Sequence, residues 1–149
     1  MKAVIQRVTY SNLSIDNKIY SQINRGLVVL IGITHDDGDN DIQWLAKKIV
    51  NLRIFNDDKN IMNKSLIDVS GELMIVSQFT LHAQTKKGNR PSYIDAANGD
   101  IAEKIYRSFI LEIENKYNLK LKTGKFGADM KVELENDGPV TIIIDTKNK

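Results

Sequence analysis

Residues 72–81 read ELMIVSQFTL, an almost unbroken run of residues that favour β-structure. Such a run is typical of a strand buried on both faces near the centre of a sheet. The apolar segment at residues 26–34 has the same character and predicts a second strand of this kind. Three polar side chains, Ser77, Gln78 and Thr80, lie near the end of the first run. Because binding sites often lie where such strands end, this is the first candidate for a functional site.

Shorter elements surround these two strands. The pattern predicts further strands at residues 2–9, 12–16, 18–23, 130–136 and 140–146. Apolar residues at helical spacing predict helices over residues 39–52 and 100–117. The buried stripe of the second helix is expected to hold Ile101, Ile105, Phe109 and Ile113. These elements predict an α+β fold with two main helices and a mostly antiparallel, barrel-like sheet. The length of 149 residues predicts a single domain, residues 1–149.

Composition narrows the class of protein. Lys and Arg total 21 against 19 Asp and Glu, so the net charge of +2 indicates neither a nucleic acid nor a membrane as partner. The chain has no cysteine, which excludes disulfides, thiolate metal sites and cysteine nucleophiles. No apolar run approaches the roughly 20 residues that a membrane span requires. We therefore expect a soluble, cytoplasmic protein with no membrane or DNA partner.

Common catalytic and metal-binding motifs are missing. The sequence has no Walker loop, no G-x-G-x-x-G, no H-E-x-x-H and no G-x-S-x-G. Asp37, Asp39 and Asp41 alternate like the first ligands of a calcium loop, but Ile42 stands where that loop requires glycine. We interpret these carboxylates as the acidic start of a helix, and we expect no metal and no cofactor.

Two histidines and two hydroxyl side chains are further candidates for chemistry. His35 and His82 each follow an apolar segment, and we interpret them as structural rather than catalytic. The hydroxyls of Ser77 and Thr80 are either hydrogen-bonded within the core or part of a site, and the sequence leaves both interpretations open.

Two basic segments and one aromatic residue indicate a nucleic-acid partner. Five lysines lie within residues 116–131, and the loop at residues 84–91 adds three more basic side chains. A solvated basic face is the simpler interpretation. Phe126, however, lies between two glycines, where its ring could stack on a base. The combination suggests that the protein binds the end of an RNA strand.

The dipeptide Gly138-Pro139 stands between two predicted strands. An ordinary turn is the simplest interpretation, because glycine and proline both favour turns. A bond before proline also permits the cis form at a cost of about 0.5–1 kcal/mol, and that form could aim two carbonyl oxygens the same way. The sequence does not reveal the isomer.

Five segments together resemble one known family, the D-aminoacyl-tRNA deacylases, which are small editing hydrolases that remove D-amino acids from tRNA. The segments are MKAVIQRV at 1–8, SQFTL at 77–81, GNRPS at 88–92, TGKFGADM at 123–130 and NDGPVT at 136–141. They occur in the family's order, and the similarity covers essentially the whole chain. The resemblance implies the fold of that family and hydrolysis of D-aminoacyl-tRNA and of glycyl-tRNA(Ala).

The resemblance also implies a homodimer with two equivalent sites at its interface. Each site would receive Gly138-Pro139 from the other subunit, whose carbonyl oxygens admit a hydrogen but not a side chain. L-aminoacyl groups would therefore be rejected, and Arg7 would help to hold the motif in place. Such a filter selects by excluding the wrong stereoisomer.

The remaining site residues follow from the same resemblance. Backbone N–H groups of Phe79 and Thr80 would stabilise the oxyanion. Ser77, Gln78 and Phe79 would line the pocket, and Thr80 would line it as well, with its backbone mattering more than its hydroxyl. The terminal adenosine of the tRNA would be held by Phe126 with Met130. The 2′-hydroxyl of the tRNA would assist the attacking water, which removes the need for a protein nucleophile.

Two alternatives stay open. The first is a non-catalytic module of the same fold that binds RNA 3′ ends. The second is a hydrolase that uses the hydroxyl of Thr80 or Ser77 as its nucleophile, although no base lies near Thr80 in the sequence.

Overall fold

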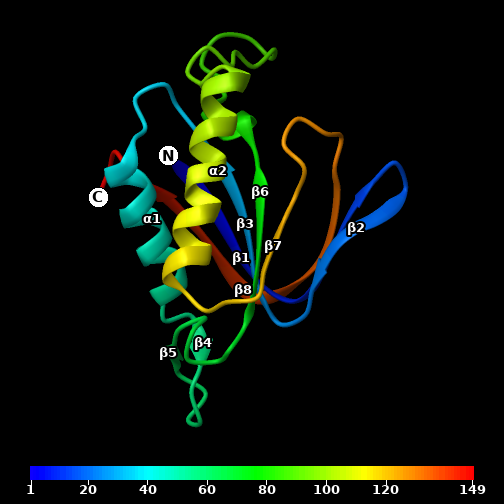
Figure 1. The fold of residues 1–149 in the computed structure, drawn as a ribbon, viewed down its shortest axis with the longest axis vertical. Coiled ribbons are helices and arrows are strands. Elements are labelled where there is room, and N and C mark those ends of the chain that lie inside the picture. Colours follow the sequence, from blue (N-terminus) through cyan, green and yellow to red (C-terminus); the bar gives the residue numbers. More distant parts are fainter.

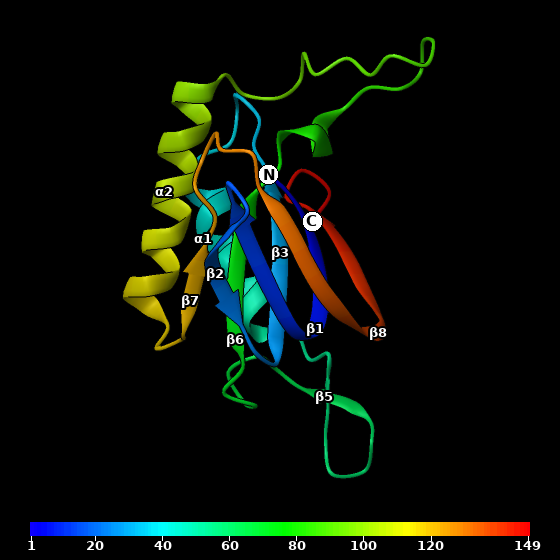
Figure 2. The same ribbon diagram turned by 90° about the vertical axis from the view of Figure 1, so that its right-hand side faces the viewer.

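The computed structural model describes all 149 residues as a curved sheet with two helices on one side (Figures 1 and 2). The six strands of this sheet are β1 (Lys2–Ile15), β2 (Lys18–Ile23), β3 (Gly26–Gly32), β6 (Glu72–Ser77), β7 (Leu121–Thr123) and β8 (Lys131–Asp145). Their order is β2-β1-β3-β6-β7, and β8 pairs with β1. A separate small hairpin, β4 (Phe55–Asn56) with β5 (Met62–Lys64), projects from one end.

The two apolar runs form the centre of the sheet, as predicted. β3 and β6 lie side by side in parallel, with Val28 opposite Met74 and Ile31 opposite Ser77. β7 also runs parallel to β6, whereas β1 pairs antiparallel with β2, β3 and β8. The α+β class with a barrel-like sheet is confirmed, but the sheet is mixed. The two helices explain the parallel pairs. One connects β3 to β6 and the other connects β6 to β7, and each helix returns the chain to the end of the sheet at which the earlier strand began.

The two predicted helices are present: the first ends one residue earlier than predicted, and the second begins and ends one residue earlier. α1 (Asp39–Asn51) begins after Gly38, which is its N-cap, and α2 (Gly99–Lys116) begins after Asn98. The Asn98 side chain accepts a hydrogen bond from the Ile101 N–H at 3.1 Å and so satisfies one free donor of the first turn.

The buried stripe of α2 differs from the predicted one. It consists of Ala102, Tyr106, Phe109 and Ile113, whereas Ile101 remains 38% exposed. A stripe that begins with the small residue Ala102 leaves space beside the sheet at the start of the helix. The main core of 23 residues lies between the helices and the sheet, and a cluster of six buried residues occupies the opposite face of the sheet.

The predicted strand over residues 72–81 is wrong in its last third. β6 ends at Ser77, and residues Phe79–His82 form one turn of 3₁₀ helix, η1. Pairing with β3 stops at Gln78, whose N–H donates to the Ile31 carbonyl at 2.7 Å. The chain then bends away from the sheet although its residues favour β-structure, because tertiary contacts override local propensity.

The strands at the two ends of the chain are longer than predicted. Residues 2–9 and 12–16 belong to the single strand β1, and residues 130–136 and 140–146 belong to the single strand β8. The pairing of these two strands moves from Gln6–Thr141 directly to Val8–Asn136, so β8 carries extra residues at this point. The Gly138-Pro139 dipeptide therefore lies in a bulge within one strand rather than in a turn between two.

Candidate active site

A pocket of about 290 Å³ opens where β3 and β6 end and α2 begins. It is lined by Ile31, Ile33, Ser77, Gln78, Phe79, Ala97, Gly99, Ala102, Phe126 and Gly127. The pocket lies at the carboxyl ends of two parallel strands, where ligands commonly bind in sheets of this kind. Four residues selected from the sequence, Ser77, Gln78, Phe79 and Phe126, come together here.

The turn η1 forms one wall of the pocket. Phe79 is its first residue, with a ring that is 56% exposed and meets the Tyr93 ring edge-on at 5.0 Å between centroids. Thr80 is the second residue and, contrary to the expectation from the resemblance, does not line the pocket. Its hydroxyl accepts a hydrogen bond from Gln78 Nε2 at 2.6 Å. The N–H groups of these first two residues cannot bond within the turn itself, which leaves them available to a ligand.

The loop after β7 forms the opposite wall. The half-buried Phe126 ring packs against Tyr106 of α2, with centroids 5.8 Å apart and ring planes at 46°. Tyr106 is itself fixed, because it is buried and its hydroxyl donates to the Ile75 carbonyl at 2.8 Å. Burial raises the pKa of Tyr106, so this phenol stays neutral and acts as a fixed support for Phe126.

Small residues at the start of α2 were missed as part of the site. Ala97, Gly99 and Ala102 line the pocket and leave it open, since none has a side chain that would fill it. The sequence AANGDIA at residues 96–102 was the available signal. A cluster of small residues at the start of a helix indicates that another group packs close to the helix backbone, but it does not identify that group.

Met130 does not line this pocket. Its sulfur packs so closely over Gly124 that a methyl group on that glycine would lie 2.5 Å away. Met130 also packs against the smaller hydrophobic cluster of the sheet. It therefore supports the loop that carries Phe126 from behind.

Gly138-Pro139 lies far from the pocket within the same chain. The peptide bond is cis, and both residues are exposed. Arg7 holds the bulge: its Nε atom lies 3.1 Å from the Asp137 carbonyl and 2.9 Å from the Asp137 carboxylate, and a second guanidinium nitrogen donates to the Ile54 carbonyl.

The register of the sheet gives the separation of the motif and the pocket. Arg7 is paired with Leu27 at the start of β3, whereas the pocket touches Ile31 and Ile33 at its end. At about 3.3 Å per residue, the two regions are roughly 15–20 Å apart along the strand.

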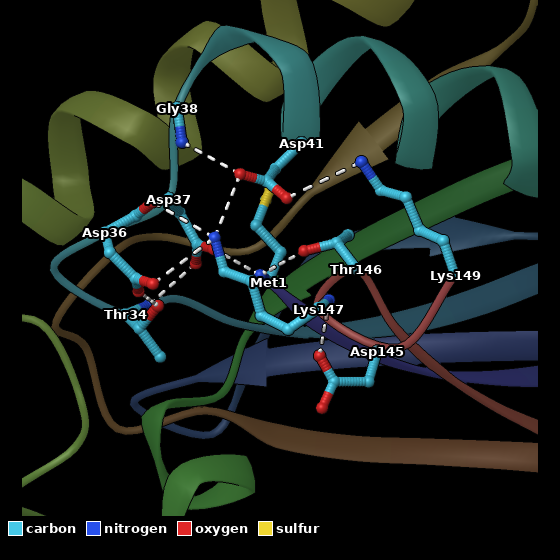
Figure 3. A network of polar contacts seen from close by, with 10 residues as sticks. All are labelled: Met1, Thr34, Asp36, Asp37, Gly38, Asp41, Asp145, Thr146, Lys147 and Lys149. Carbon is cyan, nitrogen blue, oxygen red and sulfur yellow. Dashed lines mark hydrogen bonds and ion pairs between the residues drawn. The ribbon is translucent and has the colours of Figure 1, made fainter.

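The acidic residues before and within α1 belong to a separate polar network (Figure 3). The Met1 ammonium forms an ion pair with Asp37 and donates to Thr146 Oγ1 at 2.7 Å. Lys147 lies 3.2 Å from the Asp37 carboxylate and 3.1 Å from that of Asp41. Asp37 and Asp41 are thus held by cations of the chain itself. No cluster of three or more His, Asp or Glu side chains could hold a metal ion.

Hydrogen bonds control the ionisation of this network. Burial alone would raise the pKa of Asp41, but hydrogen bonds involving Thr146 and Lys147 outweigh it and lower the pKa to about 2. Burial would also lower the pKa of Lys147, and the carboxylates of Asp41 and Asp37 reverse that effect and raise it. Both groups therefore stay charged near neutral pH.

Neither histidine lies at the pocket. His35 is exposed, and His82 is only 6% exposed with no hydrogen-bond partner for its Nε2 atom. Burial lowers the pKa of His82, so it is neutral at pH 7. The side chains around the pocket thus include no general base of the histidine type.

No helix of the structure has both the length and the apolar composition needed to cross a bilayer.

Comparison with known proteins identifies the family. The family described as D-Tyr-tRNA(Tyr) deacylase matches residues 4–145. A protein of Flavobacterium psychrophilum named D-aminoacyl-tRNA deacylase is 56% identical over 149 residues, which cover 100% of this chain and 99% of that protein. A protein of the same name from Fusobacterium nucleatum is 55% identical over 148 residues, covering 99% of this chain and 97% of that one.

Solved structures agree in fold. A protein described as c-Myc DNA Unwinding Element Binding Protein superposes with a TM-score of 0.93 at 41% identity, covering 97% of this chain and 98% of that chain. A probable eukaryotic D-amino acid tRNA deacylase has the same fold, with a TM-score of 0.81 at 18% identity and coverage of 96% and 97%. The resemblance recognised from the sequence motifs is confirmed: the chain belongs to the D-Tyr-tRNA(Tyr) deacylase family of hydrolases.

Proposed function

We propose that the protein hydrolyses the ester bond of D-aminoacyl-tRNA and of glycyl-tRNA(Ala), releasing the free amino acid and tRNA, and that it does so in the cytoplasm. Family membership supports the reaction class. The observation that carries the mechanism is the start of η1 at the edge of the pocket, with two backbone N–H groups and no histidine nearby.

The proposed chemistry needs only positioning and an oxyanion site. Water attacks the ester carbonyl, and the negative charge that forms on its oxygen is stabilised by the N–H groups of Phe79 and Thr80. One such donor typically contributes about 2.7–4 kcal/mol. The neighbouring 2′-hydroxyl of the terminal ribose orients the water, and the 3′-oxygen of the ribose leaves with a proton. Ser77 and Gln78 line the pocket around the aminoacyl group.

The selectivity would come from a second subunit. Gly138-Pro139 is exposed and lies roughly 15–20 Å along the sheet from the pocket of its own chain, so only another copy could insert it there. We therefore propose a homodimer in which the motif of each subunit closes the pocket of the other and excludes L side chains. Arg7 would position the motif through Asp137.

The terminal adenosine would stack on Phe126. Met130 would act from behind by fixing the loop at Gly124. The Phe126→Ala variant should weaken binding of the RNA end by about 1–3 kcal/mol, the usual contribution of one base on an aromatic ring. Unchanged affinity in a titration with tRNA would contradict this assignment.

Release of D-tyrosine from D-Tyr-tRNA by the purified protein tests the function. Wild-type protein should release D-tyrosine and leave L-Tyr-tRNA intact. Binding of tRNA without release above the buffer blank would favour the non-catalytic RNA-binding module.

Two hydroxyl variants test the mechanism. Thr80→Ala and Ser77→Ala should each keep most of the activity, because neither hydroxyl is the nucleophile. A loss beyond a thousandfold in a folded variant would instead favour a hydroxyl nucleophile. A substrate that ends in 2′-deoxyadenosine should react far more slowly if the ribose assists.

The proposed filter is tested by Gly138→Ala. The added methyl group would lie 3.2 Å from Asn136 Oδ1, so one of the two groups must shift by a few tenths of an ångström. The ratio of activity on D- and L-aminoacyl-tRNA should change. An unchanged ratio, or a monomer in solution, would remove this motif from the mechanism.

A further inference from the structure

A second pocket, of about 490 Å³, lies on the other side of Phe126. Its lining residues come from β2, from α2, and from the end of β7 with the loop that follows it. Phe126 lines both pockets and therefore stands between them. The volume falls within the range of about 300–1,000 Å³ that small-molecule sites usually have. The proposed deacylation does not use this space.

The aromatic residues of the second pocket suit a nucleobase. Tyr20 of β2 lines this pocket and is 53% exposed, so its ring is accessible to a ligand. Phe126 and Tyr106 form the wall shared with the first pocket, and Tyr106 is held in place by its hydrogen bond to the Ile75 carbonyl. An exposed ring beside a rigid aromatic wall is the arrangement on which single-stranded nucleic acids stack.

The charges of the pocket suit a phosphate. Its lining holds Arg107, Lys125 and one acid, Glu103. Arg107 is paired with Glu103 at 2.6 Å, whereas Lys125 is exposed and forms no ion pair. The pocket thus has one cation that no carboxylate of the protein neutralises. Lys125 directly precedes Phe126, so this charge lies where the chain passes from one pocket to the other.

We propose that the second pocket binds the penultimate nucleotide of the substrate RNA, with its base on Tyr20 and the phosphate that links it to the terminal nucleotide beside Lys125. This inference rests on the proposed function, because it assumes that the terminal adenosine stacks on Phe126 from the side of the first pocket. Stacking and a single phosphate contact tolerate any base, which suits a site that receives the common end of many tRNAs.

Two short substrates test the proposal. One is D-tyrosine esterified to adenosine, and the other is D-tyrosine esterified to the dinucleotide CpA. The wild-type kcat/KM should be higher for the dinucleotide, because only this substrate reaches the second pocket. In Tyr20→Ala the ratio of the two kcat/KM values should fall by about 5- to 150-fold, which corresponds to the loss of one stacked base. Tyr20→Phe should keep the wild-type ratio, since it keeps the ring.

The phosphate contact has its own readout. In Lys125→Ala the salt dependence of kcat/KM for the dinucleotide should become shallower by about 0.7 in the slope of log kcat/KM against log salt concentration, as for one lost contact on single-stranded RNA. Lys59→Ala is the matched control, because Lys59 is an exposed lysine in the distant β4–β5 hairpin and forms no ion pair. It should leave the slope unchanged.

The outcomes separate this inference from the proposed function. If wild-type protein hydrolyses neither substrate nor D-Tyr-tRNA, the proposed function is wrong. If it hydrolyses both short substrates equally well, or if Tyr20→Ala slows both by the same factor, the deacylase assignment stands and the second pocket has no role in binding RNA.

Discussion

Two polar clusters connect the N-terminal strand region to the C-terminal part of the chain, and they differ in how exposed their members are. At one end, the Met1 ammonium and the Asp37 carboxylate are completely buried, and Thr146 and Lys147 complete the cluster (Figure 3). In the middle of β1, Arg7 is also buried, but its partner Asp137 is 37% exposed and precedes an exposed dipeptide.

The difference indicates two purposes for the same kind of contact. The Met1–Asp37 ion pair is buried and holds no exposed motif, so we expect it to contribute to folding only. A buried arginine that holds an exposed bulge transmits the rigidity of the core to a motif at the surface. Substitutions in the first cluster should therefore change stability alone, whereas substitutions in the second should also change which substrates are accepted.

The largest effect is expected at Asp37. The Asp37→Ala variant leaves the Met1 ammonium buried without its partner, and such a loss costs about 3–5 kcal/mol. Urea denaturation should show this decrease in the free energy of unfolding. The D-to-L selectivity of the folded fraction should stay at the wild-type value. Asp36→Ala is the control, because Asp36 is an exposed carboxylate that lies next to Lys147, as Asp37 does. A loss as small as that of the control would show that the ion pair is not important for folding.

A loss of stability of similar size is expected at Arg7. Arg7→Ala removes the hydrogen bonds to the Asp137 and Ile54 carbonyls, and hydrogen bonds of charged groups contribute about 1.5–3 kcal/mol each. The D-to-L activity ratio should fall as well, because the bulge loses its anchor. Arg7→Lys keeps the charge but not the planar fork of donors, so it should recover little selectivity. If Arg7→Ala loses stability but keeps the ratio, both clusters are purely structural.

The sequence was sufficient for the elements whose burial follows a regular pattern. The apolar runs at β3 and β6 and the helical spacing in α1 and α2 predicted their positions to within about two residues, apart from the end of β6. That end was mistaken because Phe79, Thr80 and Leu81 favour strands by themselves. The turn that they form depends on contacts with β3, which lies far away in the sequence.

The site was predictable where polar or aromatic residues contribute to it. Ser77, Gln78 and Phe126 were selected from their types and Phe79 from the family resemblance, and all four line one pocket. The space itself was not predictable. It comes from small residues of α2 and from the angle at which the helix starts, and neither produces a recognisable pattern in the sequence. The distance of Gly138 from the pocket became apparent only from the register of β1 with β3 and β8.

A smaller effect is expected at Asn136, which joins the two strands beside the bulge. Its Nδ2 donates to the Arg7 carbonyl at 3.0 Å and to the Val140 carbonyl at 3.1 Å. Asn136→Ala should lower the free energy of unfolding by about 1–3 kcal/mol, because two neutral hydrogen bonds are lost and each contributes about 0.5–1.5 kcal/mol. It should also lower the D-to-L ratio less than Arg7→Ala does. Asn118→Ala, at an exposed position after α2, is the control and should change neither quantity. Equal selectivity losses in Asn136→Ala and Arg7→Ala would mean that Arg7 is not the main anchor.

The smallest effect is the acid sensitivity of the buried cluster. The pKa of Asp41 is about 2 in the folded protein, below its usual value of 3.8, so the folded state binds fewer protons than the unfolded chain at low pH. The stabilisation is therefore complete above about pH 4 and is lost as the pH falls toward 2. Asp41→Asn should flatten the dependence of stability on pH in this interval and leave the dependence above pH 5 as it is. Asp129→Asn, which changes an exposed carboxylate without an ion pair, should keep the wild-type slope. Because Arg7 holds the bulge through contacts that do not include Asp41, the selectivity of the folded protein should not follow the stability curve. A parallel decline of both would show that the two clusters are coupled through β1.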